Sequence, residues 1–357
     1  MAFIQTTALI FTFFSFFIGH IFRLRLFGIS FPLIDIAIIL ISIINFYQYF
    51  KQKDLKPKNK YFLYFLIICW LFQISNLFKL QVLSIKSFFY LIRLTSLLSL
   101  LIYPLKVSNR FKNLFLIFIF SNIIFGIIQY FVWPDFTYFD ISNWDPHLYR
   151  LVSTYFDPTF TALIYLFFII KIFLNKNIKY RSSLLVVSYV AMALTYSRST
   201  YLSFLFAFAF IAINQKKIKI FLYSFSIFLL TIILLPRQPG EGTKLERTSS
   251  IYAKIENYQE GFRLFLKSPL AGHGYNNLSI VRTINQNSHA VSGFDGSLLT
   301  ILTTTGIIGL YLFVLGIYVF FKQSNLLKKT MLISLIVHSL FANSLLYPWI
   351  LLSLVLF

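Results

Sequence analysis

Charged side chains are scarce in this chain. Asp, Glu, Lys and Arg make up only 12% of its 357 residues, whereas 58% are hydrophobic, and the mean hydropathy is +0.76. A soluble domain usually carries about 25% charged residues. The composition therefore excludes an ordinary soluble protein and predicts a polytopic membrane protein.

Cysteine is also nearly absent. Cys69 is the single cysteine and lies in an apolar run, so neither a disulfide framework nor a thiolate metal site is expected. The sequence has no HExxH motif, paired-carboxylate motif or Cys/His cluster. We therefore expect no metal and no other cofactor. The net charge of +21 resembles that of a nucleic-acid binder, but in a membrane protein the positions of the charges matter first, and we expect no nucleic-acid partner.

Long apolar runs dominate the chain, and a helix needs about 20 such residues to cross a bilayer. We predict an all-α polytopic membrane protein with about 11 transmembrane helices (10–12), forming one integral membrane domain over residues 1–357. The first run lacks a basic leader and a clear cleavage site, so it is interpreted as a span. The predicted spans are 3–21, 31–50, 61–78, 82–105, 114–132, 160–174, 184–196, 201–213, 220–235, 297–321 and 331–357.

The connectors between these runs sort by charge. Of the 11 acidic residues, nine lie in 134–158 or 237–295. The other connectors are basic and, by the positive-inside rule, face the cytoplasm. This pattern puts the N-terminus inside, the C-terminus outside, and loops 134–158 and 236–296 on the extracytoplasmic side. The arginines of "RLR" (23–25) break the rule: either that hairpin is re-entrant or they meet lipid phosphate. The basic connectors are 51–60, 106–112, 174–181, 215–219 and 322–329.

The loop at 236–296 is too long to be a simple connector and indicates function. Within it, apolar side chains recur at helical spacing. We expect an amphipathic helix that starts at Ser249 or Ser250, ends at Ser268-Pro269 and lies along the membrane surface. Its apolar residues are Ile251, Ile255, Tyr258, Phe262, Phe265 and Leu266.

Arg198 interrupts the apolar sequence in "LTYSRSTYLSF" (194–204). An arginine at a helix end is commonly an interfacial anchor that reaches the headgroups. The alternative is recognition of an anion, because a guanidinium binds phosphate through two hydrogen bonds. The neighbouring hydroxyl of Tyr196 adds a donor. Both interpretations stay open at this point.

Other candidates lie in the outer loops. Arg150, Arg247, Arg263 and Arg282 are either solvated cations or ligands for a diphosphate. His273 and His289 are candidate general bases, because the pKa of histidine lies near neutrality. Asp295 either orients His289 or caps the next helix. Arg93 lies inside a span, where a cation is either functional or paired, and Asp35 is its candidate partner.

Several stretches together resemble a known superfamily. "TYSRSTYLSF" (195–204) precedes "YQEGFRLFLKSPLAGHGYNNL" (258–278), then a histidine, then "LLTILTTTGIIGLYLF" (298–313). "RLVSTYFDPTFTAL" (150–163) is similar to a stretch that follows an earlier outer loop in proteins of the same superfamily. In order and placement, these motifs over residues 115–350 resemble the O-antigen polymerase and O-antigen ligase superfamily, the Wzy-type integral membrane glycosyltransferases.

The resemblance implies a GT-C-like fold with its active site on the periplasmic or outer face of the bacterial cytoplasmic (inner) membrane. It implies a lipid-linked substrate, an undecaprenyl-diphosphate-linked oligosaccharide, and neither a nucleotide sugar nor a metal. By position, Arg198 and Arg263 would grip the diphosphate, His289 would deprotonate the acceptor hydroxyl, and His273 is the second candidate. Secondary substrate-binding candidates are Arg247, Arg150, Tyr196, Arg282 and Arg93.

Three functions remain at this stage. A polymerase of lipid-linked repeat units, of the O-antigen or capsule type, is favoured, with a chain-length regulator as a possible protein partner. A ligase that transfers the glycan to a lipid A core is the first alternative. A transporter or flippase of lipid-linked sugars is the second, but such proteins usually carry internal repeats, and none is visible here.

Overall fold

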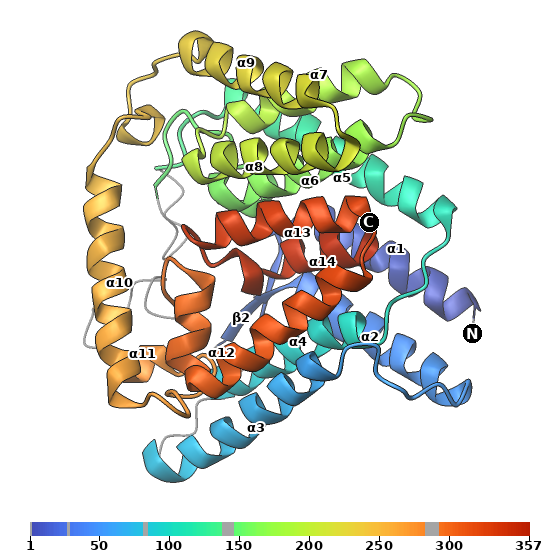
Figure 1. Ribbon diagram of the computed structural model, residues 1–357, viewed down its shortest axis with the longest axis vertical. Coiled ribbons are helices and arrows are strands. Elements are labelled where there is room, and N and C mark those ends of the chain that lie inside the picture. Colours follow the sequence, from blue (N-terminus) through green and yellow to red (C-terminus); the bar gives the residue numbers. More distant parts are fainter. Residues whose placement is uncertain (1, 27–28, 81–84, 138–145, 283–292) are drawn as a thin grey trace.

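The computed structural model describes residues 2–26, 29–80, 85–137, 146–282 and 293–357. Apart from one two-stranded hairpin, its regular elements are helices (Figure 1). The elements are α1 (Ala2–Ile18), β1 (Arg23–Leu26), β2 (Ile29–Pro32), α2 (Leu33–Lys51), α3 (Lys60–Leu80), α4 (Ile85–Ile102), α5 (Asn109–Val132), η1 (Ser153–Tyr155), α6 (Pro158–Leu174), α7 (Arg181–Ala193), α8 (Arg198–Gln215), α9 (Ile218–Leu234), η2 (Glu241–Thr243), α10 (Ser249–Lys267), α11 (Leu278–Val281), α12 (Ser297–Gln323), α13 (Leu326–Ser339), η4 (Ser344–Leu346) and α14 (Pro348–Leu356).

The predicted apolar runs form helices. The first ten correspond to α1 to α9 and α12. Among the described residues, α2, α4, α5 and α12 are long and apolar enough to cross a membrane, and α1, α3, α6, α7 and α9 contain shorter apolar helices. The prediction of a helical membrane protein is confirmed. The count of about 11 spans and the GT-C-like assignment stay predictions.

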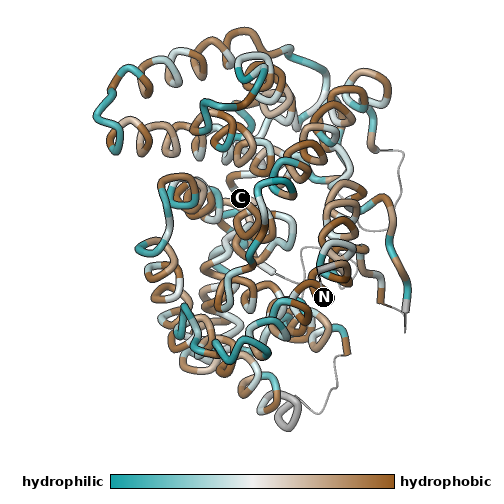
Figure 2. The backbone as a smooth tube through the Cα atoms, turned by 90° about the vertical axis from the view of Figure 1, so that its right-hand side faces the viewer, coloured by the Kyte–Doolittle hydropathy of each residue, from teal (hydrophilic) through white to brown (hydrophobic). Residues whose placement is uncertain are grey.

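Hydrogen bonds between connectors define the two ends of the helix bundle. At one end the basic connectors meet: Lys58 N donates to Ile102 O at 3.0 Å, and Gln323 Nε2 donates to Lys58 O at 3.2 Å. At the other end His20 N donates to Thr154 O at 2.8 Å. In Figure 2 hydrophilic connectors join the predominantly hydrophobic helices. The charge pattern thus correctly grouped the basic connectors 51–60 and 322–329, which lie at the same end.

The arginines that break the positive-inside rule lie on a β-hairpin. Strands β1 and β2 pair antiparallel, with Arg25 opposite Ser30. The hairpin follows His20, and so it lies at the end of the bundle that holds loop 134–158. A hairpin satisfies its own backbone hydrogen bonds through the pairing of its two strands.

The structure corrects the last predicted span. Residues 331–357 do not form one helix, because α13 ends at Ser339 and α14 begins at Pro348. Proline lacks an N–H and disfavours helix in the residue before it, so the chain turns there. Lys328 Nζ donates to Val355 O at 3.2 Å, which shows that α14 returns toward the start of α13. The C-terminus therefore lies at the end that holds the basic connectors, not at the opposite end as expected.

Helix α6 forms the centre of the core. Asp157 caps it, accepting hydrogen bonds from Thr159 N at 2.6 Å and Phe160 N at 3.1 Å, and Pro158 occupies its first turn, where proline is tolerated. From Thr161 to Ile170 every side chain is buried. Helices α7, α8, α13 and α14 pack around it. A helix that is apolar on all sides is expected at such a position.

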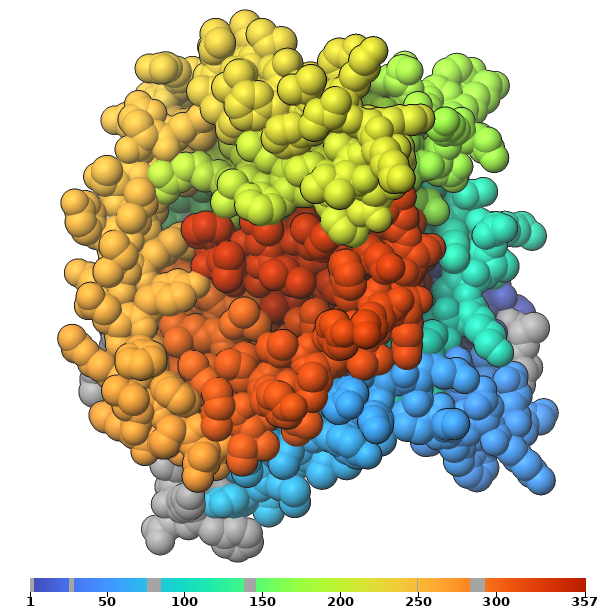
Figure 3. Space-filling model, viewed as in Figure 1, coloured from blue at the N-terminus to red at the C-terminus, as the bar shows by residue number. Residues whose placement is uncertain are grey.

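The amphipathic helix is confirmed as α10. It spans Ser249–Lys267, with Thr248 rather than a serine at its N-cap position. In Figure 1 it runs across the ends of α8 and α12, and in Figure 3 it covers one side of the molecule. This orientation agrees with a helix that lies in the plane of a membrane surface.

The segment after α10 docks onto a break in α12. Gly306, inside α12, has φ of +66°, and a Cβ added there would lie 2.1 Å from Leu270 O. The interrupted helix leaves Ile307 N free to donate to Pro269 O at 2.9 Å. His273 N likewise donates to Thr303 O at 3.0 Å. The motifs "SPLAGHG" and "TTTGIIG" are thus two sides of one junction.

Replacement of Gly306 is expected to destabilise this junction. Gly306→Ala places a Cβ against Leu270 O at a positive φ, so the unfolding free energy should fall by more than about 1 kcal/mol. Thermal unfolding of the purified protein in detergent measures this effect. The exposed neighbour Ile307→Ala serves as the control. An unchanged midpoint for Gly306→Ala would disprove the packing described here.

The two ends of the bundle should face opposite sides of the membrane. In a Cys69→Ser background, Lys267→Cys at the end of α10 should react with a membrane-impermeant maleimide on intact spheroplasts. Lys217→Cys, before α9, should react only after lysis. Both lysines are exposed. Labelling of Lys267→Cys only after lysis would reverse the predicted orientation.

Candidate functional site

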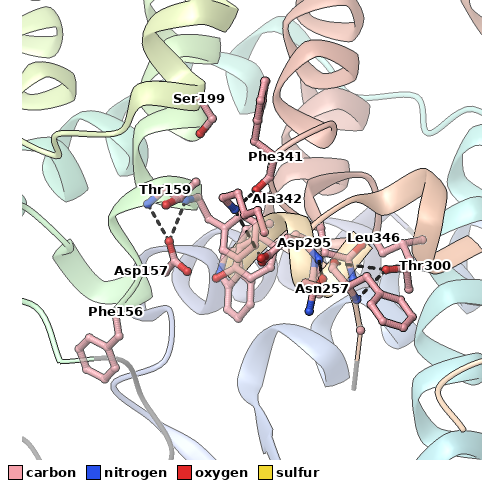
Figure 4. Close-up of a pocket in the computed structure, with 18 of the residues that line it drawn as sticks. Phe156, Asp157, Thr159, Ser199, Asn257, Asp295, Thr300, Phe341, Ala342 and Leu346 are labelled. Atoms are coloured by element: carbon pink, nitrogen blue, oxygen red, sulfur yellow. Dashed lines mark hydrogen bonds and ion pairs between the residues drawn. The ribbon is translucent and has the colours of Figure 1, made fainter. Parts of the chain in front are cut away.

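A cavity of about 1740 Å³ opens among the described residues at the end that holds the hairpin and loop 134–158. Its walls come from the β-hairpin, the first turns of α4, α6 and α8, one face of α10, and the segments that precede α12 and link α13 to α14. Figure 4 shows part of this wall. Segments distant in sequence therefore meet around one space.

The lining is strongly cationic. Eight basic side chains face two aspartates, and the cavity surface between them includes several aromatic rings. Such a charge excess favours an anionic ligand, because arginine binds phosphate and carboxylate with paired hydrogen bonds. The basic residues are Arg23, Arg25, Lys86, Arg93, Arg150, Arg198, Arg247 and Lys254; the acidic ones are Asp157 and Asp295.

The turn before α8 positions Arg198. Tyr196 has φ of +54°, and its Oη donates to Pro236 O at 2.6 Å, which fixes the turn to the start of loop 236–296. Ser197 occupies the N-cap position of α8. Arg198 follows as the first helical residue, and its side chain lines the cavity. The start of a helix also carries a partial positive charge, which adds to the attraction for anions.

Backbone carbonyl groups hold Arg198. Its Nη1 donates to Leu245 O at 3.1 Å and to Arg247 O at 2.9 Å. Its Nη2 donates to Ser250 Oγ at 2.6 Å. These acceptors are neutral, so they orient the guanidinium without neutralising it. Arg198 therefore ties the start of α8 to the segment that enters α10 and keeps its charge.

Two further arginines converge on the same place. Arg150 is 8% exposed, and its Nε donates to Thr195 O at 2.9 Å. Arg247 Nη1 donates to Gly242 O at 2.5 Å and to Lys244 O at 3.0 Å. We call Arg150, Arg198 and Arg247 the arginine triad. It joins loops 134–158 and 236–296 to the start of α8.

The triad is electrostatically unfavourable without an anion. Burial, and next the charge of Arg247, lower the pKa of Arg150 to about 10. Burial, and next the charge of Arg198, lower the pKa of Arg247. Arg150 nevertheless stays protonated at neutral pH. Like charges held this close gain from an anionic ligand, which relieves their repulsion.

The two aspartates of the wall have structural partners. Asp157 caps α6 through its Oδ1, as Figure 4 shows. Asp295 forms an ion pair with Lys254 at 3.6 Å, and its N donates to Asn257 Oδ1 at 2.8 Å. The N-cap position of α12 belongs to Gly296, so Asp295 binds α10 rather than capping α12.

The structure brings four predicted residues to the cavity: Arg150, Arg198 and Arg247, which form the triad, and Arg93. Arg93 pairs with Asp35 at 3.4 Å, so the proposed pair exists and faces the cavity as well.

Four other predicted residues lie outside the cavity wall. Arg282 is 5% exposed and donates to Glu260 at 2.9 and 2.5 Å. His273 Nε2 lies 2.9 Å from Leu264 O, so that nitrogen carries a proton. Arg263 is exposed on α10. His289 lies outside the described residues. Tyr196, though it fixes the turn, does not line the cavity either.

Sequence reasoning did not assign Arg23, Arg25 and Lys86 to the site, yet all three line the cavity. For the two hairpin arginines a signal existed, since they violated the positive-inside rule. Basic residues on the side predicted to be extracytoplasmic contradict the general bias and therefore need a local reason. The cavity supplies that reason.

Comparison with known proteins agrees with this picture. Residues 183–314, from within α7 to within α12, match the family model described as O-antigen ligase. The matched segment contains Arg198, Arg247, α10 and the junction at Gly306. No curated protein matches the chain. The match confirms the resemblance to the O-antigen polymerase and ligase superfamily and does not distinguish the two activities.

Arg282 and Arg263 should differ in their effects on stability. Arg282→Ala leaves Glu260 without its partner inside the fold, so the unfolding free energy should fall by at least about 1 kcal/mol. Arg263→Ala should change it by less than about 0.5 kcal/mol, as is usual for an exposed residue. Thermal unfolding of both variants checks this. Equal midpoints would show that the ion pair contributes nothing.

Proposed function

From the superfamily match and the charge of the cavity, we propose that this multi-pass membrane protein polymerises lipid-linked oligosaccharide repeat units. The donor is a glycan on undecaprenyl diphosphate, and the acceptor is the non-reducing end of another lipid-linked unit. The reaction takes place at the periplasmic or outer face of the bacterial cytoplasmic membrane. The arginine triad is the observation that carries the proposal, because a departing diphosphate needs a dense and fixed positive charge.

The chemistry follows from the activated bond. The acceptor hydroxyl forms a bond to C1 of the donor sugar, and the bond from C1 to the diphosphate oxygen breaks. Negative charge then builds up on the diphosphate, and prearranged arginines stabilise it. The hydroxyl proton goes to a base, for which His289 stays the sequence prediction. A cavity that aligns donor and acceptor contributes a further part of the rate enhancement.

A ligase that transfers the same glycan to a lipid A core is the second candidate. The description of the matched family favours it. Both reactions break the same bond and use the triad in the same way, so they differ only in the acceptor. Association with a chain-length regulator stays a prediction.

The surface glycan of the host should separate these activities. When the gene is deleted, a polymerase leaves surface glycan with a single repeat unit and no ladder on a gel. Deletion of a ligase abolishes glycan on the acceptor and accumulates lipid-linked polymer. An unchanged ladder would contradict both proposals.

Within that assay, Arg198→Ala should reduce polymer formation at least about 100-fold, the usual loss when a charge-stabilising donor is removed. Arg198→Lys should retain part of the activity, since lysine keeps the charge but not the planar fork. Arg237→Ala, an exposed arginine of the same outer loop, is the matched control. Chromatographic profiles should confirm that each variant folds. A normal ladder from folded Arg198→Ala would refute its role.

A further inference from the structure

The cavity has a second cationic group, formed by Arg23, Arg25, Lys86 and Arg93. These residues come from β1 and α4 and all line the cavity. They lie outside the matched segment 183–314. We call them the N-terminal cationic group.

Arg93 is the one member of this group that lies inside a predicted membrane span. Its guanidinium stacks on the ring of Tyr90 at 4.3 Å. Its Nη1 lies 3.4 Å from Asp35 Oδ2, and both side chains are 15% exposed. This distance exceeds the 2.7–2.9 Å typical of a strong charged hydrogen bond. Asp35 thus pairs loosely with Arg93 and also attracts Arg23, and its single negative charge is smaller than the four positive charges of the group.

Neutral groups hold Arg23. Its Nε donates to Ser30 Oγ at 2.9 Å, and its Nη2 donates to Ser30 O at 2.8 Å. Its Nη1 lies 3.0 Å from His20 Nδ1. A guanidinium can only donate, so His20 Nδ1 carries no proton and accepts this bond. These three hydrogen bonds fix the orientation of the Arg23 guanidinium, and none of their acceptors is charged.

The group is connected to the rest of the wall. His20 Nε2 lies 3.3 Å from Tyr347 Oη, and the ring of Tyr347 stacks on Phe160 at 4.0 Å. Phe160 follows Asp157 in the first turn of α6. Both rings line the cavity. His20, which precedes the hairpin, thus contacts the centre of the bundle through Tyr347 and Phe160.

Resting on the function proposed above, we propose that the N-terminal cationic group is a second anion-binding subsite, distinct from the arginine triad, that takes the anionic group of the acceptor. The ligand chemistry is a phosphate or carboxylate oxyanion. Its source is either the diphosphate of a second lipid carrier or an acidic sugar of the repeat unit. One cavity then holds a donor anion on the triad and an acceptor anion on the N-terminal cationic group.

Binding of simple anions to the purified protein in detergent tests the subsite without relying on activity. Isothermal titration with inorganic pyrophosphate should reveal two sites per chain. The double variant Arg25→Gln, Lys86→Gln leaves the hydrogen bonds of Arg23 intact and should weaken one site at least about fivefold. Arg23→Gln should weaken the same site, and Arg247→Gln should weaken only the other.

The outcomes separate this inference from the proposed function. If pyrophosphate binds at a single site that Arg247→Gln weakens and the N-terminal variants do not, the second subsite is refuted and the role of the triad is retained. If pyrophosphate binding weakens only in the N-terminal variants, the second subsite is supported and anion binding by the triad is contradicted. A titration with glucuronate identifies the source: binding at the N-terminal site indicates an acidic sugar, and binding of pyrophosphate alone indicates a lipid diphosphate. Binding of neither anion there overturns the proposal.

Discussion

Backbone carbonyl groups of residues 242–247 hold the charges on which the site depends. Gly242, Leu245 and Arg247 offer their oxygens to the guanidinium groups of Arg198 and Arg247. A carbonyl orients a guanidinium without carrying a negative charge of its own. Glu241 attracts Arg247 and Asp157 attracts Arg150, but each has a smaller effect on the pKa than burial and the neighbouring arginine. Several nearby cations raise the electrostatic free energy of the folded protein, and a bound anionic substrate would lower it again.

The matched family segment supplies only part of the cavity. It contains Arg198 and Arg247, whereas Arg150 precedes it and the hairpin arginines lie at the start of the chain. The motifs "SPLAGHG" and "TTTGIIG" form the junction that fixes α10 to α12 rather than touching the cavity. Within this chain, therefore, these two motifs hold the wall in place, and the charge comes from several separate segments.

The sequence predicted the helices well because apolar runs and charged connectors are local signals. It placed α10 to within a residue or two, since helical spacing and Ser268-Pro269 mark it clearly. It missed the turn between α13 and α14, because an apolar run hides a short break and only Pro348 signals it. It identified Arg93 and Asp35 as partners because Asp35 was the one acid clearly inside a span. It did not separate Arg282 from Arg247, since the contact of Arg282 with Glu260 forms only in the tertiary structure.

The burial of α14 has a consequence for how the protein assembles. From Pro348 to Phe357 every side chain is buried, and α14 packs against α2, α4 and α6. These side chains therefore contact protein rather than lipid, and they reach their buried positions only where α2, α4 and α6 are also in place.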